Sequence, residues 1–188
     1  MKQVSKKFFE QDAVDVAKKL LGKVISYNGM QGMIVETEAY KKDPASHAYK
    51  LTPRSEIMLK THGKFYIYFI YGMYYCLNIT TNKGDVGAVL IRAMEPLEGI
   101  EKMKKNRNNG NIHNLTSGPG KLCDALKITK ALNNTPVNWK IKVLHHRNFK
   151  DSEVISAKRI GISKGNDLDW RFYIKDNKFV SFPKGNVY

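Results

Sequence analysis

The longest apolar segment of the chain is also its most aromatic. Residues 64–80, KFYIYFIYGMYYCLNIT, hold five of the ten tyrosines, and no charged residue lies between Lys64 and Lys83. Aromatic and β-branched residues favour strands, and Gly72 near the centre allows the backbone angles of a tight turn. The segment therefore predicts a β-hairpin with Tyr71-Gly72-Met73 at its tip.

Alternation along the first of these strands separates two kinds of side chain. One face carries Phe65, Ile67 and Phe69, and the other carries Tyr66, Tyr68 and Ile70. One face can fill a core, while the other offers phenol rings on which a planar ligand could stack. A hairpin that serves only the core explains the same pattern. Five tyrosines, an asparagine and a central glycine argue against a membrane span.

The rest of the chain predicts short helices and strands. Asp12 is placed to cap a helix that ends at Gly22, and Asn28-Gly29 between two β-type runs predicts a second hairpin. The other expected elements are a helical turn at 58–60, strands at 88–93, 139–144, 157–162 and 171–174, and a basic helix at 97–106 after Pro96 breaks its strand. Together they predict one α+β domain, residues 1–188.

The strand of the second hairpin carries the first candidate chemistry. In GMIVETEAY, residues 32–40, alternation places Ile34, Glu36, Glu38 and Tyr40 on one face. Two carboxylates close together hold protons more tightly, which suits general acid/base chemistry if the site is dry. A solvated strand face explains the spacing equally well, and spacing does not say which carboxylate would act.

Two further segments could meet a charged partner. Arg92 interrupts the apolar run 88–93, so it needs an acidic or phosphate partner or a route to solvent, and Glu38 is a candidate. The turn 116–121, TSGPGK, precedes a helix and adds the charge of Lys121 to exposed backbone N–H groups, which suits an anion. An ordinary helix start explains this turn as well, and the P-loop spacing is absent.

The charge balance narrows the class of partner. The 188 residues include 32 Lys and Arg against 17 Asp and Glu, a net charge of +15. This excess suits nucleic acid first and an anionic membrane surface second, although a lysine-rich proteome would also produce it. The two cysteines have no metal-ligand spacing and predict neither a disulfide nor a zinc site. The N-terminus lacks an apolar signal core, so we expect a cytoplasmic protein.

Several long motifs in fixed order resemble the alkyladenine (3-methyladenine) DNA glycosylase family of the mammalian alkylpurine type, over nearly the whole chain. They are LLGKVI at 20–25, IVETEAY at 34–40, SHA at 46–48, TPR at 52–54, YIYFIYGMYYCLNI at 66–79, VLIRAMEPLEG at 89–99 and SGPGKLCDAL at 117–126, with weaker matches RIGI at 159–162 and RFYI at 171–174. The chain departs from the mammalian pattern at residues 107–114 and 133–156. The resemblance implies a curved, mostly antiparallel sheet, surrounding helices and a protruding β-hairpin.

The resemblance also implies a function. Such enzymes hydrolyse the N-glycosidic bond of an alkylated or deaminated purine (the 3-methyladenine, hypoxanthine and ethenoadenine class) in double-stranded DNA and leave an abasic site. The base must leave the stack before the chemistry. By this resemblance Glu38 is the general base for the attacking water, with Arg92 and a main-chain carbonyl near Ile160 beside that water.

The same resemblance implies the remaining roles. The flipped base lies between Tyr40 on one side and His47 with Tyr68 on the other, and Asn78 lies against the purine 2-position. Tyr71 and Met73 enter the minor groove, and DNA phosphate is contacted by Ser117, Gly118, Gly120 and Lys121. We expect no metal, organic cofactor, lyase step or required protein partner, and a bacterial-type, nucleoid-associated monomer.

Two other functions fit part of the sequence. The aromatic strand after Gly63 loosely echoes the RNA-recognition motif, in which strand aromatics stack single-stranded bases. A non-catalytic module of that kind gives no role to Glu38 or Arg92. A structural or ribosome-associated basic protein would explain the charge alone.

Overall fold

The computed structural model describes residues 1–165 and 167–181 of the chain. Its strands are β1 Val24–Tyr27, β2 Met30–Tyr40, β3 Phe65–Ile70, β4 Tyr74–Thr80, β5 Ala88–Glu98, β6 Lys142–Leu144, β7 Val154–Ala157 and β8 Arg171–Ile174. They form one eight-stranded sheet with the order β3-β4-β5-β2-β1-β6, to which β8 is added beside β2, with β7 beyond it. Every strand pairing is antiparallel.

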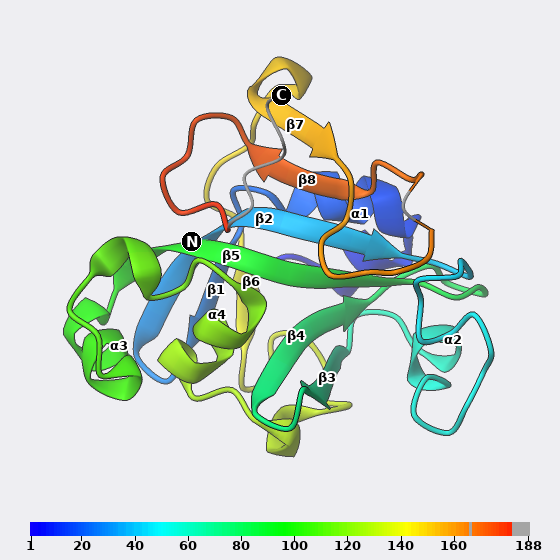
Figure 1. Cartoon of the computed structure of the whole chain (residues 1–188), viewed down its shortest axis with the longest axis horizontal. Coiled ribbons are helices and arrows are strands. Elements are labelled where there is room, and N and C mark those ends of the chain that lie inside the picture. Colours follow the sequence, from blue (N-terminus) through cyan, green and yellow to red (C-terminus); the bar gives the residue numbers. More distant parts are fainter. Residues whose placement is uncertain (166, 182–188) are drawn as a thin grey trace.

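The helices lie around this curled sheet (Figure 1). They are α1 Ala13–Leu20, α2 Ile57–Lys60, α3 Ile100–Arg107 and α4 Pro119–Leu126, with short 3-10 helices at Lys6–Glu10, Ile112–Asn114, Lys130–Leu132 and Asp151–Glu153. Helix α1 contacts β2 and β5, and α4 contacts β4 and β5. Apolar side chains from these elements share one main core, which confirms the expected α+β class. None of the helices in the described ranges is long and apolar enough to cross a membrane.

Local sequence signals fix both hairpins and the first helix. The Asp12 side chain accepts a hydrogen bond from the Val14 N–H at 2.9 Å, as expected of an N-cap. Asn28 and Gly29 both have positive φ, which is what a two-residue turn between twisted strands requires. Strands β3 and β4 pair from Phe65↔Ile79 to Ile70↔Tyr74, so the predicted aromatic hairpin is confirmed, and it extends at the bottom of Figure 1.

The two faces of β3 separate as the alternation predicts. Phe65 and Ile67 are buried in the main core, but Phe69, on the same face near the hairpin tip, is exposed and does not join it. Tyr66, Tyr68 and Ile70 point instead into a cavity described below. Hence the hairpin serves the core with one face and a cavity with the other, and the two interpretations of the sequence hold together.

The strand that carries Glu36 and Glu38 is not regular. Ile34 pairs with Met94, whereas Glu36 pairs with Ala93. Two steps along β2 thus match one step along β5, and an extra residue bulges out and reverses the alternation. Ile34 packs in the main core, so the prediction that it shares the face of Glu36 is wrong.

The prediction that Pro96 breaks its strand is wrong. β5 continues to Glu98, and Pro96 pairs with Gly32. Proline is tolerated at this end because β4 pairs only with the first residues of β5, so that no described strand pairs with Pro96 on the other side. The following helix α3 consequently begins at Ile100, after Gly99 with φ of +71°, rather than at residue 97.

Two other strand predictions were misplaced. Only Lys142–Leu144 of the expected strand 139–144 is extended and paired. The expected strand at 157–162 is instead β7, which ends at Ala157. Beyond it the chain turns inward so that Arg159 reaches a buried carboxylate, and Gly161 has φ of +74°. The isoleucines at 160 and 162 have strand propensity, but tertiary contacts override it.

Candidate active site

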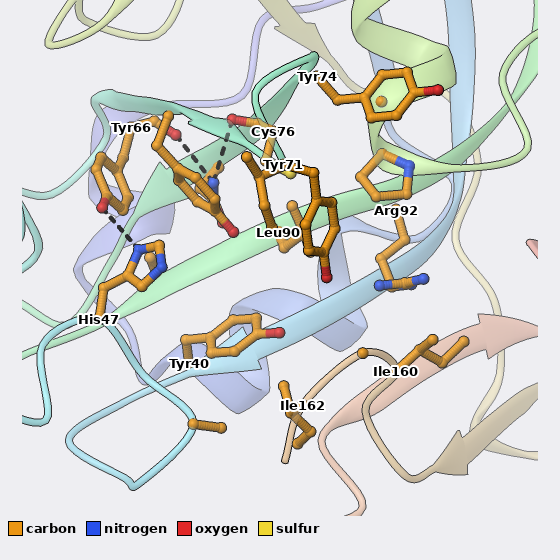
Figure 2. A pocket seen from close by; sticks show the side chains of 18 of the residues that line it. Tyr40, His47, Tyr66, Tyr71, Tyr74, Cys76, Leu90, Arg92, Ile160 and Ile162 are labelled. Atoms are coloured by element: carbon orange, nitrogen blue, oxygen red, sulfur yellow. Dashed lines mark hydrogen bonds between the residues drawn. The ribbon is translucent and has the colours of Figure 1, made fainter. Parts of the chain in front are cut away.

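A cavity of about 330 Å³ opens between the end of β2, the β3–β4 hairpin and the segment 160–162. This volume lies within the range of small-molecule sites. In Figure 2 the side chains of Tyr40, His47, Tyr71 and Arg92 surround its open centre. The full lining is Tyr40, Ala45, His47, Met58, Tyr66, Tyr68, Ile70, Tyr71, Tyr74, Cys76, Asn78, Ala88, Leu90, Arg92, Pro119, Gly120, Ile160, Gly161 and Ile162.

Glu38 lies directly behind this lining and is fully buried. Its Oε2 accepts a hydrogen bond from the Tyr40 hydroxyl at 2.8 Å, and its Oε1 accepts one from the Ile160 N–H at 2.7 Å. The Arg92 guanidinium lies 3.3 Å from Oε1. All three partner residues line the cavity, whereas Glu38 itself does not.

The other carboxylate of β2 has a different environment. Glu36 binds the guanidinium groups of Arg92, at 3.2 Å, and Arg171, at 2.6 Å. It also accepts hydrogen bonds from the main-chain N–H and the hydroxyl of Ser181, at 2.7 and 3.0 Å. Glu36 does not line the cavity, and it holds the arginine that does. The expected pairing of Arg92 with Glu38 is confirmed, and Glu36 is a partner that the sequence did not indicate.

Electrostatics set the protonation of the arginine and the phenol beside Glu38. Burial acts to lower the pKa of Arg92, but the charges of Glu38 and Glu36 outweigh it and raise the pKa, so the guanidinium stays charged. Burial and the negative charge of Glu38 both raise the pKa of Tyr40. The phenol therefore remains a hydrogen-bond donor.

Aromatic rings form the facing walls of the cavity. Tyr40 lies at the end of β2, whereas Tyr66 and Tyr68 come from β3. The His47 ring meets Tyr68 edge to face at 4.5 Å between centroids, and its Nδ1 is 3.0 Å from the Tyr66 hydroxyl. Burial lowers the pKa of His47, and the positive charge of Arg54 lowers it further, so the imidazole is neutral at pH 7.

Tyr74, Cys76 and Asn78 of β4 form the cavity wall that continues the hairpin. The Asn78 side chain is buried and donates to the main-chain oxygen of Tyr66 at 3.0 Å. Cys76 is a free thiol beside it, and burial raises its pKa to about 11. An amide held rigidly in this wall limits the shape of any ring that enters.

The hairpin tip is the most exposed part of this region. Tyr71 is 74% exposed and Met73 is 61% exposed. Tyr71 and Gly72 both have positive φ, and the Met73 N–H bonds back to the Ile70 oxygen at 3.2 Å. Positive φ is uncommon for tyrosine, and such strain concentrates at functional sites. An exposed aromatic ring is thus presented on a tight turn at the mouth of the cavity.

The predicted anion-binding turn lies on the rim. Gly118 is the N-cap of α4 and supplies no side-chain cap. Ser117, Gly118, Gly120 and Lys121 line a second hollow that adjoins the cavity across Tyr74 and also holds Arg107, His113 and Lys178. A Cβ at Gly120 would approach the Tyr74 ring to 2.9 Å, so close packing also requires this glycine.

The sequence-predicted site residues therefore lie in one region, around the cavity and on its rim. Around the cavity are Tyr40, His47, Tyr68, Tyr71, Asn78, Arg92 and Ile160, with Glu38 directly behind; Met73 is exposed at the tip, and the α4 turn lies on the rim. At Ile160 the group that meets Glu38 is the N–H, whereas the family resemblance implies a carbonyl beside the water. Residues 1–165 and 167–181 contain no group of three or more His, Cys, Asp or Glu placed to hold a metal ion.

Comparison with known proteins gives the family. The sequence profile of the family described as methylpurine-DNA glycosylase matches residues 7–178. Proteins provisionally named 3-methyladenine DNA glycosylase are similar over nearly their whole length. One from Clostridium perfringens is 48% identical, covering 95% of this chain and 98% of its own, and one from Clostridium novyi is 43% identical, covering 96% and 99%.

A relative outside the clostridia gives the same result. A protein of Prosthecochloris aestuarii with the same provisional name is 45% identical, and the match covers 96% of this chain and 92% of the relative. These findings agree with the motif resemblance, and the family match includes every residue of the cavity lining. The chain belongs to the methylpurine-DNA glycosylase family.

Proposed function

We propose that this protein is a base-excision repair glycosylase that removes alkylated or deaminated purines from double-stranded DNA. The observation that carries the proposal is Glu38, a fully buried carboxylate whose three contacts line a cavity walled by aromatic rings. General-base chemistry needs a positioned carboxylate, and a flipped base needs a stacking pocket beside it. Family membership and the names of the relatives support the same activity.

The proposed reaction begins with base flipping. Tyr71 enters the minor groove and fills the space of the extruded nucleotide, with Met73 beside it, because an aromatic ring restores part of the lost stacking. The base then lies between Tyr40 and the pair His47 and Tyr68. An electron-poor purine stacks well on electron-rich phenols. Asn78 crowds the 2-position, which disfavours normal guanine.

Glu38 then acts as general base for a water that attacks the sugar C1′. Its Oε1 already meets the Ile160 N–H and Arg92, whereas among the described residues Oε2 accepts from Tyr40 alone. A carboxylate oxygen can accept a second hydrogen bond, so Oε2 is where the water binds. As the base departs, the carboxylate also stabilises the positive charge that grows on the sugar.

The rim would hold the DNA backbone. Ser117, Gly118, Gly120 and Lys121 contact a phosphate through the helix start and the lysine charge, and the adjoining cations extend the surface. The net charge of +15 favours DNA association in general. We further propose that the protein acts as a monomer with no required protein partner.

The direct test uses a duplex with one hypoxanthine. The protein is incubated with the duplex, and abasic sites are then cleaved with alkali. We expect strand cleavage only after alkali, because water and not a lysine is the nucleophile. Tight binding to single strands with no abasic product, for hypoxanthine, ethenoadenine and 3-methyladenine alike, would instead support the non-catalytic module.

The hairpin tip makes a separate prediction. Tyr71→Ala is expected to weaken binding to a lesion-containing duplex about tenfold, because stacking on one base contributes about 1–3 kcal/mol. The ring is 74% exposed, so the melting temperature should stay close to that of the wild type. Affinities are measured by titration of labelled duplex. Tyr71→Phe keeps the ring and is the matched control. Equal affinities for the wild type and Tyr71→Ala would refute the wedge role.

A further inference from the structure

A buried ion pair lies against the cavity wall, and the mechanism above gives it no role. Arg159 binds both oxygens of Asp43, with Nη2 at 2.6 Å from Oδ1 and Nη1 at 3.2 Å from Oδ2. The two side chains are 0% and 7% exposed. Neither residue lines the cavity, so neither is placed to touch a bound base. The pair acts on the site only through its neighbours.

The first neighbour is Tyr40. The Arg159 guanidinium carbon lies 4.8 Å from the centroid of the Tyr40 ring, and Nη1 donates to the main-chain oxygen of Ala39 at 3.0 Å. The same guanidinium lies 5.2 Å from the ring of Trp170. A planar cation that stacks on a ring and also bonds to the preceding peptide fixes the orientation and position of that ring relative to the backbone.

The second neighbour is the water-binding carboxylate. Ile160 directly follows Arg159, and its N–H is the group that donates to Glu38 Oε1 at 2.7 Å. Asp43 in turn accepts from the main-chain N–H groups of Lys41 and Ala45, at 3.3 and 3.0 Å, and so shapes the loop that leads to His47. One ion pair thus joins β2, the loop 41–47 and the segment 158–162.

Stability alone is a poor reason for such a pair. Replacing a buried ion pair by apolar residues of similar volume is often neutral or stabilising, because the desolvation of both charges offsets their attraction. The Nε of Arg159 is also buried without a partner among the described residues, which adds to that desolvation. A role in the geometry of the site accounts for the location better than a role in the free energy of folding.

We infer that Asp43 and Arg159 are positioning residues for base excision, which hold the Tyr40 ring and the Ile160 N–H in register with Glu38. The inference rests on the proposed function. It predicts that the pair affects the rate of excision and not the affinity for DNA. The reason is that the proposed DNA-contacting groups, the exposed tip at Tyr71 and the α4 turn, do not contact the pair.

The test compares two measurements on Arg159→Met and Asp43→Asn. Single-turnover release of hypoxanthine is expected to fall about 100-fold for Arg159→Met and about 10-fold or more for Asp43→Asn, since misplacement of about 1 Å can cost that much. The Kd for a duplex with a tetrahydrofuran abasic analogue, which has no base to stack, should stay within about threefold of the wild type. Arg159→Lys keeps the charge without the planar fork and should give an intermediate rate.

The matched control is Lys158→Met. Lys158 is the preceding residue and carries the same charge, but its pair with Asp169 at 3.6 Å is exposed, so excision should be unchanged. Because Arg159→Met leaves Asp43 buried and unpaired, the double variant Asp43→Asn/Arg159→Met removes both charges and serves as a second test. Its melting temperature is measured alongside.

The outcomes separate this inference from the proposed function. If the wild type releases no base, the proposed function fails. If the wild type is active and Arg159→Met or the double variant excises at the wild-type rate, the positioning role is wrong. If the rate and the affinity for the abasic analogue fall together in the double variant, the pair has only a structural role, which also overturns the inference. A lower rate with retained affinity supports it.

Discussion

Glu38→Gln is expected to lower the single-turnover rate of hypoxanthine release about 1000-fold, because general-base catalysis and charge stabilisation are lost together. Glutamine has the same shape as glutamate. Its amide oxygen can still accept from the Ile160 N–H, and its amide nitrogen can donate to the Tyr40 hydroxyl, which reverses one hydrogen bond. It cannot take a proton from water.

The measurement is alkali cleavage of a hypoxanthine duplex with enzyme in excess, combined with the Kd for the tetrahydrofuran duplex. The control is Glu95→Gln, which removes the same charge from neighbouring β5, where Glu95 is half-buried and accepts from Asn177 at 2.9 Å. This control should excise normally. If Glu38→Gln excises within about tenfold of the wild-type rate, the loss is too small for a missing general base, and another group must activate the water.

Local signals predicted a large part of the frame. Asn28-Gly29 fixes one hairpin because few residue pairs accept positive φ twice, and Asp12 fixes the start of α1 by its own hydrogen bond. The aromatic hairpin could be predicted from an uncharged run with a central Gly72. These features depend on residues close together in the chain, so their signals survive in the sequence alone.

The errors arise where distant contacts decide the structure. Pro96 stays in β5 because none of the described strands pairs with it on its other side, and sequence does not show which neighbours a strand has. The bulge next to Glu36 reverses alternation, and only the pairing with β5 reveals it. Ile160 has strand propensity, but the preceding Arg159 turns inward to Asp43, which is more than a hundred positions earlier.

The candidate site was also predicted only in part from the sequence. Motif resemblance gave Glu38, Tyr40, His47, Tyr68 and Arg92, and the structure brings them together around or directly behind one cavity. Spacing alone could not distinguish the two carboxylates of β2. Both are fully buried, but every described partner of Glu38 lines the cavity, whereas Arg171 and Ser181, which bind the other carboxylate, do not.

The other carboxylate, Glu36, makes the last prediction. Its Oε1 accepts from Arg171, Arg92 and the Ser181 hydroxyl, and its Oε2 accepts from the Ser181 N–H. Every partner donates, so an amide nitrogen at this position would face a donor. The buried Arg171 guanidinium would also lose this counter-charge, and Arg92 would keep only that of Glu38.

Glu36→Gln is therefore expected to lower the free energy of unfolding by about 3 kcal/mol, since breaking a buried pair costs about 3–5 kcal/mol. For a chain of this length the melting temperature should fall by about 6–12 °C. Urea and thermal unfolding followed by circular dichroism measure both quantities. Glu95→Gln, whose hydrogen-bond partner among the described residues is the neutral Asn177, should change the free energy by less than about 1 kcal/mol. Because Glu38→Gln is expected to lose activity and Glu36→Gln to lose stability, the two variants assign chemistry to one carboxylate and support to the other. Equal melting temperatures for the wild type and Glu36→Gln would refute the supporting role.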